Sequence, residues 1–264
     1  MWFADFGTVA LLAFITLLDG VRRIPAGALV LRRVGFGAWR VSDEGSDRDR
    51  WMLVSWWPPI SHHVVAAAGE ESVSVAELDA RLGRVLRFRL ALIALSTVSL
   101  FALVLGVPLA SGTFGPIGFL SAAIVVLITC LITTIVATFA VASLGRTFLD
   151  ALRSTRQLLS PFSTNRSWEI VLEQATRGAE PLMVVRRFLG RPFEAWVRSL
   201  AYDTIRGGME APALGALMDL DQLQAIVKAP PDGRGKDEPF CPRCARTYRA
   251  HVTECADCSV PLQW

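Results

Sequence analysis

Residues 90–144 read LALIALSTVSLFALVLGVPLASGTFGPIGFLSAAIVVLITCLITTIVATFAVASL and contain no Asp, Glu, Lys, Arg or His. A break with Gly and Pro, Ser111–Gly118, divides them into apolar runs of 21 residues (90–110) and 26 residues (119–144). A helix needs roughly 20 residues to cross a hydrocarbon core of about 30 Å. Apolar runs of this length favour membrane spans over buried core helices. We therefore expect a transmembrane hairpin that turns at the break.

The N-terminus carries a third apolar run, MWFADFGTVALLAFITLL, over residues 1–18. It lacks the basic start and the small-residue cleavage site of a signal peptide. Asp5 lies near its outer end, where a charge costs less than at the centre of a span. We expect a first transmembrane helix over residues 1–20; the alternative is a helix that lies in the membrane interface.

The arginines flank these apolar runs on one side only. Arg22 and Arg23 follow the first run, Arg87 and Arg89 close a group before the second, and Arg146 follows the third. No basic residue precedes the first run or lies in the break. By the positive-inside rule, the N-terminus and the break face outward and both polar portions face the cytoplasm. We expect a protein of the bacterial cytoplasmic (inner) membrane.

Residues 21–73 are predicted to form a small β-rich unit. Gly35–Gly37 and Asp43–Asp47 are typical turn sequences between short runs rich in Val, Leu and Trp. We expect Trp51 in the core of this unit, and the same for Trp56-Trp57 unless that pair lies at the membrane interface. The expected strands are residues 28–34, 38–42, 50–57 and 64–68.

An amphipathic helix is predicted to begin after Ser74, which forms a capping box with Glu77. We expect this helix to run unbroken into the second span, so that residues 74–145 comprise the helix and the hairpin. Arginines on the helix are candidates for binding anionic lipid phosphates, each contributing about 1 kcal/mol near an anionic surface. These arginines are Arg81, Arg84 and Arg87.

Small residues recur every four positions in the third span, which lets a neighbouring helix approach closely. They are Cys130, Thr134, Thr138 and Ala142. The helix that packs there is the second span, a second copy of the chain, or another membrane protein subunit. The expected partners are therefore other membrane subunits or the chain itself.

Residues 146–229 are predicted to form a cytoplasmic helical domain, followed by a linker at residues 230–239. Prolines mark the points where helices begin or are interrupted. They are Pro161, Pro181, Pro192 and Pro212.

The last 24 residues hold four of the five cysteines, arranged as two C-x-x-C pairs. The pairs are Cys241–Cys244 and Cys255–Cys258, separated by ten residues. Two such turns brought together present four thiolates in the tetrahedral arrangement that structural zinc prefers. Disulfides conflict with the cytoplasmic side derived above, where thiols stay reduced. We therefore expect a structural Zn²⁺ bound by these four cysteines in residues 240–264.

The tail sequence, from Phe240-Cys241-Pro242-x-Cys244 to Cys255-x-Asp257-Cys258-x-x-Pro261-Leu262, resembles the short zinc-ribbon tails of many bacterial membrane and signalling proteins. The resemblance covers about the last tenth of the chain and implies a structural zinc and an interaction surface, but no reaction. Such tails usually carry Gly after the second Cys of each pair. Ala245 and Ser259 stand there, which suggests a looser turn geometry.

The sequence contains no G-x-S-x-G, P-loop or H-E-x-x-H motif. The adjacent His62 and His63 should point to opposite faces of a strand, and we expect both at the surface. We therefore expect a protein without catalytic activity. Its expected role is that of a scaffold or accessory subunit of a larger membrane assembly, for example an energy-transducing one. An enzyme is the alternative if these histidines cluster with acidic residues in a pocket.

A second alternative is a membrane-tethered regulator whose tail binds nucleic acid or a signalling partner. The tail carries three arginines and His251, against two acidic residues, Glu254 and Asp257. This basic character is weak, and the net charge of +3 for the whole chain does not by itself imply nucleic acid. The tail arginines are Arg243, Arg246 and Arg249.

Overall fold

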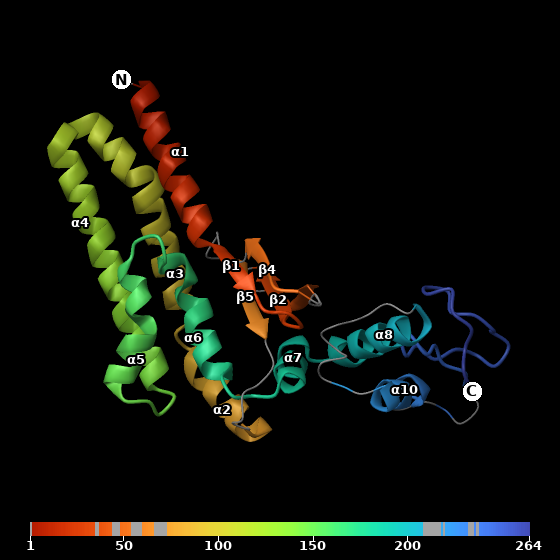
Figure 1. Cartoon of the computed structure of the whole chain (residues 1–264). Helices are drawn as coiled ribbons and strands as arrows, with labels where there is room; N and C mark the ends of the chain where they lie inside the picture. Colours follow the sequence, from red (N-terminus) through yellow and green to blue (C-terminus); the bar gives the residue numbers. More distant parts are fainter. Residues whose placement is uncertain are drawn as a thin grey trace.

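A computed structural model describes residues 2–34, 37–43, 48–53, 60–65, 73–207, 218, 220–231, 235 and 238–264. In Figure 1 long helices stand side by side at one end, with the β-strands next to the base of α1. Helices α8 and α10 and the C-terminal segment lie at the other end. The expectation of a mainly helical chain with a small β-rich part and a C-terminal cysteine cluster is confirmed.

The apolar stretch forms one long helical unit. It consists of α3 (Arg89–Phe101), the π-helical segment η1 (Ala102–Gly106) and α4 (Val107–Ala142). The unit Arg89–Ala142 is long and apolar enough to cross a membrane. The chain rises along α3, bends over and descends along α4 (Figure 1). The reversal is at Gly115, whose φ of +60° favours glycine, so the predicted break is a turn.

Gly118 lies where the two arms of this turn cross at close range. A Cβ atom there would be 2.0 Å from the carbonyl oxygen of Ala110 and 2.8 Å from the Cβ atom of Phe114. Real Cβ atoms do not approach other atoms this closely. The turn therefore requires glycine at position 118.

We expect Gly118→Ala to destabilise the helical unit, because the backbone of Ala110 must move to admit one methyl group. Overpacking of this kind costs about 1–3 kcal/mol. Thermal unfolding of the full chain in detergent measures the effect. Gly106→Ala is the matched control, because a Cβ at Gly106 meets nothing closer than 3.8 Å. Equal melting temperatures for the two variants would contradict this account of the turn.

Helix α1 (Trp2–Asp19) lies along the hairpin. Leu12 packs against a small apolar cluster on the hairpin. Asp19 ends α1 with its carboxylate 3.2 Å from the Ser163 hydroxyl and 4.0 Å from the Arg166 guanidinium. Gly7–Asp19 is apolar but shorter than the helical unit described above. The cluster that receives Leu12 consists of Leu103, Val107, Val126 and Cys130.

Five short strands form two antiparallel sheets beside the base of α1. One sheet pairs β1 with β4, and the other has the order β3-β2-β5. The strands are β1 (Val21–Ile24), β2 (Leu29–Val34), β3 (Arg40–Asp43), β4 (Arg50–Leu53) and β5 (Ile60–Val65). Leu29 and Leu31 pack toward the helices, whereas Val30 packs on the opposite side against Ile24 and Met52.

The expectation that Trp51 lies in the core is wrong, because its side chain is 72% exposed. Partly buried and exposed positions alternate along β4. Trp51 and Leu53 therefore share its exposed face. Trp56 and Trp57 are not among the described residues, and neither are residues 44–47 of the second predicted turn.

Helix α2 (Val75–Leu86) begins as predicted, with the Ser74 hydroxyl accepting a hydrogen bond from the Glu77 backbone N–H. It does not run unbroken into α3, because Arg87 and Phe88 form a turn between them. The Glu77 carboxylate pairs with Arg81 at 2.6 Å rather than reaching back to the cap.

In the described part of the chain, seven further helical segments follow α4. They are α5 (Phe148–Thr155), η2 (Arg156–Leu159), η3 (Thr164–Arg166), α6 (Ser167–Thr176), α7 (Pro181–Leu189), α8 (Pro192–Gly207) and α10 (Leu220–Lys228). Pro181 and Pro192 begin α7 and α8 as predicted, Pro161 lies in a turn, and Pro212 lies outside the described residues. Half of the linker predicted at residues 230–239 also lies outside them.

The small residues of α4 pack within the chain. The Thr138 hydroxyl is 2.7 Å from that of Thr155 in α5, which lies alongside α4 (Figure 1). The Cys130 sulfur is 3.7 Å from the Ser99 hydroxyl in α3. Within the chain, the second span, α3, therefore packs on this face of α4, as one of the three expected partners. Helix α5 packs there as well.

Two apolar clusters are the largest among the described residues. The larger one contains the base of the hairpin together with α2, α6, α7 and the inner face of β2. The smaller one contains α8, α10 and the C-terminal segment. Trp196 of α8 contacts both cores. Residues 146–229 thus contribute to both.

Candidate metal centre

The four tail cysteines lie together. Their sulfur atoms are all within 4.8 Å of one another, and none forms a disulfide. Cys241 and Cys255 are buried, whereas Cys244 and Cys258 are partly exposed. The fifth cysteine, Cys130, lies in α4 and does not belong to the cluster.

Two similar turns position these sulfurs. The Ala245 N–H donates to the carbonyl of Cys241, and the Ser259 N–H donates to the carbonyl of Cys255, both at 2.9 Å. Ala245 and Ser259 have φ values of +62° and +50°, where glycine is the usual residue. Both turns therefore adopt the backbone of a glycine-containing knuckle despite lacking the glycine.

The donor set suits a metal ion of tetrahedral preference. Bonds of about 2.3 Å from zinc to sulfur place neighbouring sulfurs about 3.8 Å apart. The sulfurs of Cys244 and Cys255 are 3.7 Å apart, and four thiolates complete a closed shell. The geometry and chemistry of these side chains thus fit a bound metal ion.

Without metal, the thiols differ in acidity. Burial raises the pKa of Cys241 to about 11 and also raises that of Cys258. Burial also acts to raise the pKa of Cys255, but hydrogen bonds from the Tyr248 hydroxyl and nearby backbone N–H groups outweigh it and lower this pKa to about 6. Metal binding must therefore release protons from the other thiols, so metal affinity should fall as the pH falls.

The C-terminal segment is docked on α8. The Arg243 guanidinium pairs with Asp203 at 2.9 Å. Arg198, which is 2% exposed, donates to the Ala229 carbonyl at 2.6 Å and lies 5.8 Å from the centre of the Phe240 ring. Because Cys241 and Cys255 belong to the same core as α8 and α10, the cluster is continuous with their packing.

Two arginines of the tail are engaged within the chain. Arg243 pairs with Asp203, and Arg246 pairs with Asp257. Only Arg249 of the three arginines expected to bind nucleic acid has no acidic partner among the described residues. This pairing weakens the basic character on which that alternative depends.

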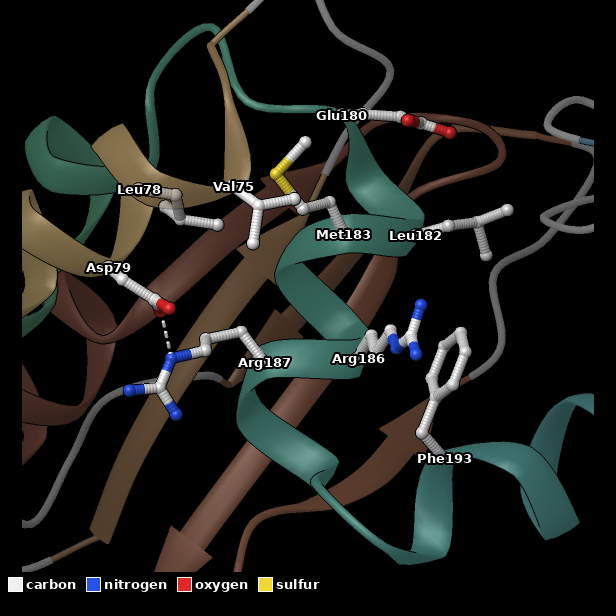
Figure 2. Close-up of a pocket in the computed structure, with 9 residues that line it drawn as sticks. All are labelled: Val75, Leu78, Asp79, Glu180, Leu182, Met183, Arg186, Arg187 and Phe193. Carbon is white, nitrogen blue, oxygen red and sulfur yellow. Dashed lines mark hydrogen bonds and ion pairs between the residues drawn. The ribbon is translucent and has the colours of Figure 1, made fainter. Parts of the chain in front are cut away.

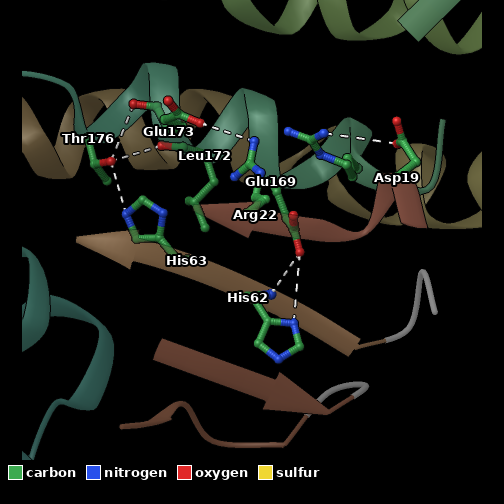
Figure 3. A network of polar contacts seen from close by, with 9 residues as sticks. Asp19, Arg22, His62, His63, Glu169, Leu172, Glu173 and Thr176 are labelled. Carbon is green, nitrogen blue, oxygen red and sulfur yellow. Dashed lines mark hydrogen bonds and ion pairs between the residues drawn. The ribbon is translucent and has the colours of Figure 1, made fainter. Parts of the chain in front are cut away.

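A buried polar network connects β5 to α6 (Figure 3). Glu169, 4% exposed, accepts a hydrogen bond from the His62 backbone N–H at 3.2 Å, and its carboxylate is 3.9 Å from the His62 ring. The Thr176 hydroxyl is 3.0 Å from the ring of His63, and Glu173 pairs with Arg22 at 3.7 Å. The network thus covers the edge strand of the sheet with polar groups of α6.

The expectation that both histidines are at the surface is wrong, because they are 8% and 4% exposed. They point to opposite sides of β5, as expected (Figure 3). Burial, and next the charge of Arg32, lower the pKa of His62 to about 4. Burial, and next the charge of Arg22, lower the pKa of His63 to about 3. Both rings are therefore neutral at pH 7.

The contact of His62 with Glu169 and that of His63 with Thr176 join residues 107 and 113 positions apart, so motif searches of the sequence miss them. Of the clustering set as the condition for an enzyme, the structure shows the contact between His62 and Glu169.

A cleft of about 620 Å³ lies between α2 and α7, at the junction of the two cores (Figure 2). Leu78 and Met183 form part of its apolar wall, and Phe193 of α8 lies at its edge. Arg187 pairs with Asp79 across the two helices. Its lining thus combines apolar side chains with four charged ones, Asp79, Glu180, Arg186 and Arg187.

Comparison with known proteins supplies no relative: no family model, no curated protein and no solved structure matches this chain.

Proposed function

We propose that the protein is an integral protein of the bacterial cytoplasmic membrane that acts without catalysis, as a scaffold or accessory subunit of a larger membrane assembly. In this proposal α1, α3 with η1, and α4 are three spans, and the remaining elements lie in the cytoplasm. The four cysteines bind a structural Zn²⁺, which holds the C-terminal segment as an interaction module on α8.

The observation that carries the proposal is the outward face of α4. Its exposed apolar side chains extend from Phe119 to Phe139, which is about 30 Å along a helix and equals the thickness of a hydrocarbon core. A water-soluble monomer rarely exposes an apolar patch above a few hundred Å². The exposed residues are Phe119, Leu120, Ile124, Val125, Leu127, Ile128, Leu131, Ile132, Ile135 and Phe139.

The polar side chains of α4 are compatible with lipid. Thr129, Thr133, Thr134 and Thr138 each donate a hydroxyl hydrogen bond to the carbonyl four residues earlier, at 2.7–3.0 Å. A hydroxyl satisfied within its own helix avoids the cost of an unpaired polar group in hydrocarbon. The arginines at the base of the hairpin support the cytoplasmic side for the remaining elements.

The three arginines expected to bind lipid differ in how far contacts within the chain occupy their guanidinium groups. Arg81 pairs with Glu77, and Arg84 donates to the carbonyl of Ser143 at 3.3 Å. Arg87 donates to the carbonyl of Arg84 at 2.9 Å through its Nε atom, which leaves its terminal nitrogens for an anionic lipid. Of the three, Arg87 is therefore the arginine that we propose for lipid binding.

Isolation of the full chain from native membranes in mild detergent tests the proposed role. We expect stoichiometric membrane proteins to co-purify with it, and to be lost from the Cys255→Ser variant if the zinc module supplies the contact. The Cys130→Ser variant is the control, because Cys130 lies outside the cysteine cluster. A lone monomer under these conditions would exclude the role of subunit.

A further inference from the structure

The three-stranded sheet carries a row of nitrogen-bearing side chains, one from each strand. Arg32 of β2 lies directly opposite Arg40 of β3 on one side and His62 of β5 on the other. Directly opposed residues of antiparallel strands project to the same face, so these three side chains are neighbours. This face is the one opposite Leu31, which packs into the larger core.

The two arginines of this row lack a counter-charge. Both are exposed, and neither forms a hydrogen bond or an ion pair with any described residue. Like charges directly opposite each other destabilise an antiparallel pair. Arg22 and Arg23 in the neighbouring sheet, by contrast, pair with Glu173 and Asp49. The pair Arg32–Arg40 therefore carries two positive charges that no described residue neutralises.

A hollow of about 650 Å³ lies between these two arginines. Gly37, whose N–H donates to the Val34 carbonyl at 2.9 Å, also lines it. Ser42 lines the hollow and donates its hydroxyl hydrogen to the Val30 carbonyl, so that its oxygen can still accept. The volume lies within the range typical of small-ligand sites, about 300–1,000 Å³.

We propose that Arg32 and Arg40 together bind a phosphate-bearing anion in this hollow. Guanidinium groups present paired N–H donors that match two oxygens of a phosphate. A phosphate monoester carries close to two negative charges at pH 7, which equals the charge of the two arginines, whereas a carboxylate carries one. A soluble phosphate monoester and the headgroup of phosphatidic acid both supply this chemistry.

Calorimetric titration of the purified full chain in nonionic detergent at low salt, with inorganic pyrophosphate as the probe, tests the proposal. We expect saturable binding to one site. Arg32→Ala and Arg40→Ala should each weaken it about ten- to hundredfold, which is the effect of losing a charge-assisted contact. Arg32→Lys should weaken it less than Arg32→Ala, since it keeps the charge but loses the paired donors.

Arg23→Ala is the matched control, because it removes the same charge from the neighbouring sheet but one that Asp49 already pairs. It should change the affinity by no more than about twofold, as expected for screened surface charge. Removing one of two repelling charges should leave the melting temperature of Arg40→Ala at or above that of the unaltered chain. Loss of binding without loss of stability thus separates a site from a folding defect.

A second arm distinguishes the sources of phosphate. Soluble short-chain phosphatidic acid, whose phosphate is a monoester, that competes with pyrophosphate while the phosphatidylcholine analogue does not, would identify a lipid headgroup. Pyrophosphate binding without such competition would identify a soluble phosphate ester, and both results support the proposal. Absence of saturable binding by either probe would overturn it. An equal loss of affinity in Arg23→Ala and Arg32→Ala would do the same, because it indicates diffuse charge attraction.

Discussion

Replacing Cys255 with Ser should remove the bound metal from the chain and unfold the C-terminal segment. Structural zinc contributes about 10–16 kcal/mol to the folding of small zinc modules, and residues 240–264 have only Phe240, Pro242 and Val260 as buried apolar side chains apart from the cysteines. Because Cys255 packs in one core with α8 and α10, we expect these helices to lose protection as well.

Metal content by mass spectrometry and amide hydrogen exchange of the full chain measure this effect. The unaltered chain should contain one zinc ion, and exchange in residues 240–264 should be slow. Cys130→Ser is the matched control, since it removes a buried thiol outside the cluster and should leave both readings unchanged. A Cys255→Ser protein with full metal content and a protected tail would show that the cysteines do not form the centre.

Acidification should destabilise the chain through His62 and His63, independently of the metal. Their pKa values in the folded chain, about 4 and about 3, lie below the ordinary value of 6.5. Below pH 6.5 the unfolded chain therefore binds protons that the folded chain does not, and the free energy of unfolding falls. Each histidine contributes about 1.4 kcal/mol per pH unit, down to about pH 4 for His62 and about pH 3 for His63.

Chemical unfolding at a series of pH values between 7 and 4 measures this slope. His63→Gln should be less stable than the unaltered chain at pH 7, because the contact with Thr176 is altered, but its stability should fall less steeply with acid. Acid release of the metal affects both proteins alike, so it cancels in the difference. His251→Gln, which changes an exposed histidine, is the control and should retain the full slope. A His63→Gln slope equal to that of the unaltered chain would contradict the assignment.

Local sequence signals predict a large part of this fold. The apolar run at residues 90–144 gives the long helical unit, and Ser74, Pro181 and Pro192 mark helix starts where the structure has them. The spacing of the cysteines predicts their cluster, because each C-x-x-C turn fixes its own two sulfurs. These features depend on neighbours within a few positions along the chain.

The sequence does not predict the contacts between distant elements. Glu169 lies on a helix face that periodicity assigns to the surface, yet it is buried because the edge of β5 lies against it. Strand β1, with the sequence VRRI, has no alternating pattern and follows α1 after one residue. Trp51 is exposed on β4, although tryptophan is highly buried on average. In each case tertiary packing decides the outcome.

Cysteine labelling in spheroplasts tests the proposed membrane hairpin most directly. Thr113→Cys places a thiol at the turn of the hairpin, and Arg153→Cys places one on the exposed face of α5. With a membrane-impermeant maleimide, we predict that position 113 is labelled in intact spheroplasts and that position 153 is labelled only after lysis. Labelling of position 153 from outside, or recovery of the chain in the soluble fraction, would contradict a hairpin that crosses the bilayer with its polar portions in the cytoplasm.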